Sequence, residues 1–137
     1  MGLYLCVFDG DEEVEGVEVG SYADFGLLRD TIHERLEGGV YGARFPTLMN
    51  HSDCDGTWSS GEAELLQAEL ATIAVEFTAL APIPLDVEWK KSVARTVGLK
   101  PANLLECFFD VDGEPLLDRL RALCACSIRR ELPIVFQ

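Results

Sequence analysis

Residues 59–80, SSGEAELLQAELATIAVEFTAL, carry the longest helical pattern of the sequence. Ser59 and Glu62 have the spacing of a capping box, in which each side chain accepts a hydrogen bond from the backbone N–H of the other residue. Apolar residues then recur every three or four positions, as on one face of a helix, at Leu66, Leu70, Ile73, Phe77 and Leu80. The pattern predicts a long amphipathic helix, and such a helix needs an apolar surface to cover.

Two apolar stretches near the ends of the chain predict that surface. LYLCVF at residues 3–8 is followed by the turn pair Asp9-Gly10, and LPIVFQ occupies residues 132–137. Uninterrupted apolar runs of this length are typical of strands inside a sheet. Strands are also predicted at residues 44–49 (RFPTLM) and 104–111 (LLECFFDV). The valines of residues 14–19 could form a hairpin return, although a solvated acidic loop is the favoured interpretation of residues 9–18.

Three more helices are predicted from caps and apolar spacing. The first follows Ser21 and ends at Gly38-Gly39, the second runs from Asp86 to Gly98, and the third begins at Pro115. We therefore expect one domain over residues 1–137 with four to five strands and about four helices. The architecture is α/β or α+β, with a mixed sheet covered by helices, and the strand order does not follow from the sequence.

The formal net charge of −13 is distributed unevenly. Residues 1–89 contain 18 acidic and 3 basic residues, a difference of −15, whereas residues 90–137 contain 6 acidic and 8 basic residues, a difference of +2. A strongly negative surface repels nucleic acids and anionic lipids and speeds association with cationic partners. The sequence favours a protein that binds a basic partner and disfavours direct DNA, RNA or membrane binding.

Cysteine usage and hydropathy favour a cytoplasmic protein. The five cysteines form an odd set without a Cys-x-x-Cys pair, and the N-terminus lacks the basic region and long apolar stretch of a signal peptide. No apolar run approaches the roughly 20 residues needed to cross a bilayer. We expect an unanchored chain in a reducing compartment, and these observations do not determine its oligomeric state.

Two D-x-D-G stretches are the candidates for a catalytic centre. The first, Asp53-Cys54-Asp55-Gly56-Thr57, has the D-x-D-G-T order of haloacid-dehalogenase-type phosphatases, but polar residues precede it where that chemistry needs an apolar strand. The second, residues 110–113, leaves too little chain for such a domain and is typical of a turn. An EF-hand calcium loop would need its glycine two places later than the first stretch has it. No metal, no cofactor and no complete catalytic set is predicted.

Two acidic segments are candidates for a partner-binding surface. Asp53 and Asp55 lie on a polar loop beside His51 and Trp58, and Trp58 is either a packing residue or an interface anchor. The second segment contains five acidic residues near the N-terminus: Asp9, Asp11, Glu12, Glu13 and Glu15. Because like charges repel one another, both segments would gain from meeting cations.

Five blocks of the sequence carry a resemblance to a known family: GLYLCVF (2–8), EGVEVGSYADF (15–25), GARFPTLMNHSDCDGTW (42–58), NLLECFFDVDGEPLL (103–117) and LPIVFQ (132–137). They resemble the immunity protein 70 family, predicted antidotes in bacterial polymorphic toxin systems, over almost the whole chain. The resemblance implies a protein without catalysis that binds and neutralises a cognate toxin. A basic nuclease is one toxin class that an acidic inhibitor could block.

Two other classes of function stay open on the sequence alone. A small metal-dependent hydrolase would bring the aspartates of the D-x-D-G loops into one pocket. A structural subunit of a larger complex would show large apolar patches on its surface.

Overall fold

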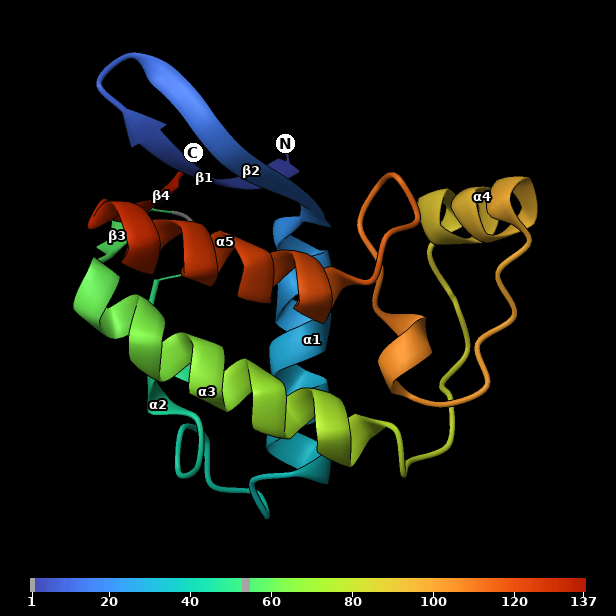
Figure 1. Cartoon of the computed structure of the whole chain (residues 1–137). Helices are drawn as coiled ribbons and strands as arrows, with labels where there is room; N and C mark the ends of the chain where they lie inside the picture. Colours follow the sequence, from blue (N-terminus) through green and yellow to red (C-terminus); the bar gives the residue numbers. More distant parts are fainter. Residues whose placement is uncertain (1, 53–54) are drawn as a thin grey trace.

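A single four-stranded sheet and a layer of helices make up the computed structural model, which describes residues 2–52 and 55–137 (Figure 1). Across the sheet the order is β2 (Glu12–Ser21), β1 (Gly2–Asp9), β4 (Ile134–Phe136) and β3 (Thr57–Trp58). All three neighbouring pairs are antiparallel. The α+β alternative is therefore the observed one, and the sheet is antiparallel where a mixed sheet was expected.

The two apolar end segments lie side by side in the centre of the sheet, as expected. Leu5 of β1 is paired with Phe136 of β4, and Val7 is paired with Ile134. The side chains of Leu5, Val7 and Ile134 are fully buried. Their burial explains why these strands are continuously apolar and why they sit between the two edge strands.

Helices cover the sheet and one another. Figure 1 shows α3 (Ser60–Phe77) and α5 (Leu116–Arg130) side by side beneath the β1–β2 hairpin, with α1 (Tyr22–Arg35) crossing behind them. The remaining helical elements are α2 (Pro46–Met49), α4 (Glu88–Val97) and the 3₁₀ turn η1 (Leu105–Cys107). The predicted capping box of α3 is confirmed, because Ser59 Oγ accepts from Glu62 N at 3.1 Å and Glu62 Oε1 accepts from Ser59 N at 3.0 Å.

Two predicted strands are wrong. Residues 46–49 form the short helix α2, because Pro46 occupies the first helical turn, where a missing N–H has no cost. Residues 104–111 contain η1 and a single bridge between Phe109 and Pro115 in place of a strand. That segment is apolar because its side chains fill the space between helices: the Phe108 ring stacks on Phe77 at 5.7 Å, and Phe109 meets Trp89 at 6.0 Å.

The acidic segment of residues 9–18 is a hairpin, and the favoured prediction of a solvated loop is wrong. It forms the turn of the β1–β2 hairpin and most of β2, with Asp9 opposite Glu12 and Leu5 opposite Val17. Val17 and Val19 point into the core, and their burial fixes β2 against β1 despite the charges between them. The hairpin alternative is confirmed.

Candidate functional site

The acidic hairpin, defined here as residues 9–18, lies at one edge of the sheet. β2 is the edge strand, and it presents exposed carboxylates at Glu12, Glu13 and Glu18, with Glu15 partly exposed, while Asp11 is exposed in the turn before it. Charged side chains on an edge strand prevent pairing with other sheet edges. They also concentrate negative potential along residues 12–18, a stretch of about 23 Å at about 3.3 Å per residue.

Three contacts hold the acidic hairpin in place. The Tyr4 hydroxyl donates to Glu13 Oε2 at 2.8 Å, and Arg119 of α5 donates to the carbonyl of Gly16 at 2.8 Å. Burial, together with this bond and the nearby Glu13 charge, raises the pKa of Tyr4 to about 12. Arg130 at the end of α5 lies 3.8 Å from Asp9 Oδ2.

The other carboxylates of the hairpin have no cation beside them. Within residues 2–52 and 55–137, Asp11, Glu12, Glu15 and Glu18 form no ion pair. The Arg130–Asp9 pair is itself largely exposed, and such pairs contribute little, about 0–1 kcal/mol. The hairpin therefore keeps most of its charge available for a partner.

The second predicted surface, here called the His51 loop (residues 51–58), lies at the opposite edge beside β3. Its Asp55 is exposed, whereas Asp53 and Cys54 lie outside the described residues. The carbonyl of His51 accepts from the guanidinium of Arg29 at 2.8 Å, and Arg29 also donates to the carbonyl of Leu48 at 2.8 Å. Arg29 is a buried cation on α1 that the sequence reasoning missed, because helix periodicity alone gives no reason to place it inward.

The His51 ring contacts the backbone of this loop and the ring of Phe136. Its Nδ1 and Nε2 atoms lie 2.8 Å from the carbonyl oxygens of Ser52 and Thr57, and the ring stacks on Phe136 at 4.4 Å. Phe136 N also donates to the carbonyl of Gly56 at 3.1 Å. These contacts fix the backbone around Asp55, so His51 supports the loop from its inner side.

Trp58 is a buried packing residue. In the free protein its side chain is not exposed for direct contact with a partner. Its side chain is 1% exposed, its ring packs at 4.8 Å from both His51 and Phe136, and its Nε1 donates to the carbonyl of Thr47 at 3.0 Å. A side chain that is buried in the free protein has no surface to offer to a partner. The packing alternative for Trp58 is the observed one.

The register of the sheet separates the two acidic surfaces. Thr57 of β3 is level with Val135, Val135 with Cys6, and Cys6 with Gly16 of β2. Three strand spacings therefore lie between them, about 14 Å. A single partner could contact both surfaces only through an interface wide enough to reach from one edge strand of the sheet to the other.

The second D-x-D-G stretch is a structural turn. Asp110 is buried, and its Oδ1 accepts from the backbone N–H groups of Asp112 at 2.9 Å and Glu114 at 3.0 Å. Its Oδ2 faces Arg119 Nε at 3.7 Å. In the described part of the chain, no three His, Cys, Asp or Glu side chains are grouped so that they could hold a metal ion. The carboxylate of Asp110 is thus occupied in shaping the connection into α5.

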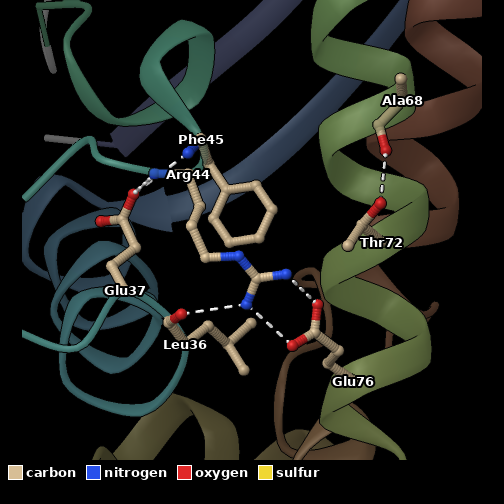
Figure 2. Close-up of polar contacts among 7 residues, drawn as sticks. All are labelled: Leu36, Glu37, Arg44, Phe45, Ala68, Thr72 and Glu76. Atoms are coloured by element: carbon tan, nitrogen blue, oxygen red, sulfur yellow. Dashed lines mark hydrogen bonds and ion pairs between the residues drawn. The ribbon is translucent and has the colours of Figure 1, made fainter.

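A loop that the sequence reasoning did not single out is pinned between α1 and α3 (Figure 2). Arg44 donates to both carboxylate oxygens of Glu76, at 2.8 and 2.5 Å, and to the carbonyl of Leu36 at 3.0 Å. The buried carboxylate of Glu37 accepts from the backbone N–H groups of Gly42, Arg44 and Phe45, at 2.9, 3.0 and 3.1 Å. These bonds order a loop whose Val40 and Tyr41 side chains are exposed.

Exposed large apolar side chains are scattered over the described surface. Val40 and Tyr41 lie on that loop, Leu65 and Val75 lie ten residues apart on α3, and Val97 lies on α4. Single exposed apolar residues are ordinary on a soluble surface, whereas a constitutive subunit interface is a contiguous patch.

No helix of the described chain is long and apolar enough to cross a membrane.

Comparisons with known proteins gave one match. The profile of the family described as Immunity protein 70 matches residues 3–136, nearly the whole chain. No curated protein and no solved structure matches.

Proposed function

Because the chain belongs to the immunity protein 70 family, we propose that it binds and neutralises a cognate bacterial toxin, without catalysis and in the cytoplasm. Inhibition by binding requires only that the inhibitor cover the active site or another functional surface of the toxin. The Asp110 carboxylate of the second D-x-D-G stretch is used structurally, which agrees with a role that needs no reaction.

The acidic hairpin is the proposed contact surface, with Asp9, Asp11, Glu12, Glu13 and Glu15 as its predicted contacts. The observation that carries this proposal is that Asp11 in the hairpin turn and Glu12, Glu15 and Glu18 on the edge strand make no ion pair in the described structure, while Asp9 has only the largely exposed pair with Arg130. Such a surface attracts a cationic partner from a distance and speeds association. Toxins with a basic active site, such as nucleases, are the class of partner that fits this charge.

The His51 loop is the second proposed contact, through Asp53 and Asp55. In this role His51 and Trp58 act indirectly, because they pack behind the loop and hold Asp55 in place. Tight inhibition at nanomolar to picomolar Kd corresponds to about −12 to −16 kcal/mol and needs desolvated anchors besides charge. With Trp58 buried, exposed apolar side chains such as Tyr41 are the remaining candidates for that role.

The test of the function is protection from the product of the neighbouring gene. The adjacent open reading frame is expressed from an inducible promoter with and without this protein, and the two products are then purified together. We expect growth to be rescued and a stable complex to form. Toxicity that persists at full expression of this protein, for every adjacent candidate, would refute the immunity role.

The contact surface is tested by charge-neutral variants. The triple variant Asp11→Asn, Glu12→Gln, Glu18→Gln removes three exposed charges from the acidic hairpin, and its association rate should fall on the order of tenfold at low salt, with the difference shrinking as salt screens the charges. A matched control places the same loss of charge on exposed helix and turn positions: Glu34→Gln, Glu64→Gln and Asp112→Asn. Equal slowing by the two variants would show that net charge matters and the hairpin does not.

A further inference from the structure

Lys90 is a buried lysine on the first turn of α4. Its side chain is 4% exposed, whereas the neighbouring Lys91 and the more distant Lys100 are exposed. The ammonium of Lys90 lies over three aromatic rings, with Nζ at 5.1 Å from the centroid of Phe108, 5.8 Å from Trp89 and 5.9 Å from Phe109. Lysines are almost never buried without a paired charge, so this placement requires an explanation.

The polar surroundings of Lys90 do not provide that pairing. Over residues 2–52 and 55–137, Lys90 makes no hydrogen bond and no ion pair within 4.0 Å. Burial lowers the pKa of the Lys90 amine, and the more distant charges of Asp24 and Cys107 oppose that effect without overcoming it. Asp24 is engaged elsewhere, because its Oδ2 accepts from Ser21 N at 2.7 Å and from Trp89 Nε1 at 3.0 Å.

A cavity of about 190 Å³ adjoins this lysine. Its walls are mostly apolar, with Leu27, Ile83, Leu85 and Val87 among the residues that line it, and Lys90 is the only cation among them. The thiol of Cys107 is tied to the backbone of Ile83, since Sγ accepts from Ile83 N at 3.4 Å and donates to Ile83 O at 3.5 Å. Burial also raises the pKa of that thiol and so disfavours its nucleophilic thiolate form, whereas the nucleophilic form of Lys90 is the neutral amine, which burial favours by lowering the pKa of Lys90.

We propose that Lys90 is a nucleophilic amine that forms a Schiff base with small uncharged aldehydes bound in this cavity. Apolar walls favour a small organic molecule over water, and Asp86, the acidic residue among those that line the cavity, disfavours an anionic one. Lysines that are desolvated in apolar pockets are the ones that attack carbonyl groups, because a larger fraction of them carries a free lone pair.

The reaction balances without any further reagent. The Nζ lone pair attacks the aldehyde carbon, a C–N bond forms, and the carbonyl electrons move to oxygen, which takes a proton from nitrogen. The resulting carbinolamine loses its hydroxyl group together with the second nitrogen proton as water. A C=N bond between Nζ and the aldehyde carbon remains, and nothing is oxidised or reduced.

The test is competitive labelling of the folded protein with propanal, in which cyanoborohydride traps each imine as a propyl amine. The sequence offers an internal control, because cleavage after Glu88 and Glu106 gives one peptide, residues 89–106, that contains all three lysines of the chain. Fragment-ion mass spectrometry then compares Lys90 with Lys91 and Lys100 in the same molecule. The variant Lys91→Arg, Lys100→Arg changes only exposed positions and leaves Lys90 as the sole ε-amine.

At pH 7 we expect Lys90 to be modified several-fold faster than Lys91 and Lys100. The difference should disappear in urea, which exposes Lys90 as fully as the other two lysines. Faster labelling of Lys91 and Lys100 at every pH, with Lys90 modified only after unfolding, would overturn the proposal. So would an unmodified Lys90 in the double variant under conditions that label its N-terminus.

Discussion

Replacing Trp58 by Phe tests whether this residue serves the core or an interface. The substitution keeps an aromatic ring between His51 and Phe136 but removes the indole N–H that donates to the carbonyl of Thr47 at 3.0 Å. Because the side chain is 1% exposed, the space left behind is not open to solvent. A packing residue should therefore change stability and leave the outer surface as it is.

The size of the effect follows from two losses. Removing one partner of this hydrogen bond costs about 1 kcal/mol, the low end of the range, because the bond is only part-buried and Thr47 is itself partly exposed. Phe has two side-chain carbons and one nitrogen fewer than Trp, and at about 0.8 kcal/mol per buried carbon the two carbons add about 2 kcal/mol. The free energy of unfolding should fall by about 3 kcal/mol, a large share of the roughly 5–15 kcal/mol of a domain.

Urea unfolding followed by circular dichroism measures this loss without relying on tryptophan fluorescence. A second, direct measurement uses Trp89→Phe, which leaves Trp58 as the sole tryptophan of the chain. Its fluorescence should be poorly quenched by acrylamide in the folded state and well quenched in urea. A stability loss below about 0.5 kcal/mol in Trp58→Phe, or strong quenching of Trp58 in the folded protein, would refute the assignment of Trp58 to the core.

Three further outcomes follow from other contacts. Glu37→Ala removes the acceptor of three backbone N–H groups, so the free energy of unfolding should fall by about 3 kcal/mol, and thermal unfolding of Glu34→Ala, an exposed position on α1, should differ from wild type by less than about 0.5 kcal/mol. The Tyr4 hydroxyl should titrate near pH 12 in the absorbance of tyrosinate, and Glu13→Gln should lower that value. Because the pKa of Tyr4 in the folded protein lies above its ordinary value of 10.0, its contribution to stability is complete below pH 10 and is lost as the pH rises through about 12. Ser59→Ala removes the cap of α3 and should cost about 1 kcal/mol in chemical denaturation, whereas an unchanged midpoint would show that the capping box is not formed in solution.

The elements that the sequence predicted correctly are those with local signals. Ser59 and Glu62 cap α3 through their own side chains, and the apolar run of β1 ends at a turn pair, so neighbouring residues were sufficient. The failures at residues 44–49 and 104–111 have a different cause. Both segments are apolar because they fill space between distant elements, as Phe108 does against Phe77, and burial alone does not distinguish a strand from a packed turn.

The candidate site likewise combines features that local sequence predicts with features that depend on packing between distant residues. Acidic residues could be located in the sequence, but their exposure depended on whether residues 9–18 were a loop or a strand, and Val17 and Val19 decided this by packing into the core. Arg29 and Lys90 could not be identified in advance, because each is a cation buried by residues far away in the chain. Their environments exist only after α1 meets the His51 loop and α4 meets the η1 region.

Charge that is segregated along the sequence is not segregated in space. The slightly basic last third of the chain includes α5, and α5 packs against β2, so its Arg119 and Arg130 lie beside the acidic hairpin (Figure 1). Arg119 uses its guanidinium on a carbonyl and on the buried Asp110, and Arg130 meets only Asp9, at 3.8 Å. Neither cation pairs with Asp11 or Glu12. Helix α5 therefore anchors the acidic hairpin through the Gly16 carbonyl and the Asp9 carboxylate and leaves Asp11 and Glu12 without an ion pair, which is the arrangement that a surface for a cationic partner needs.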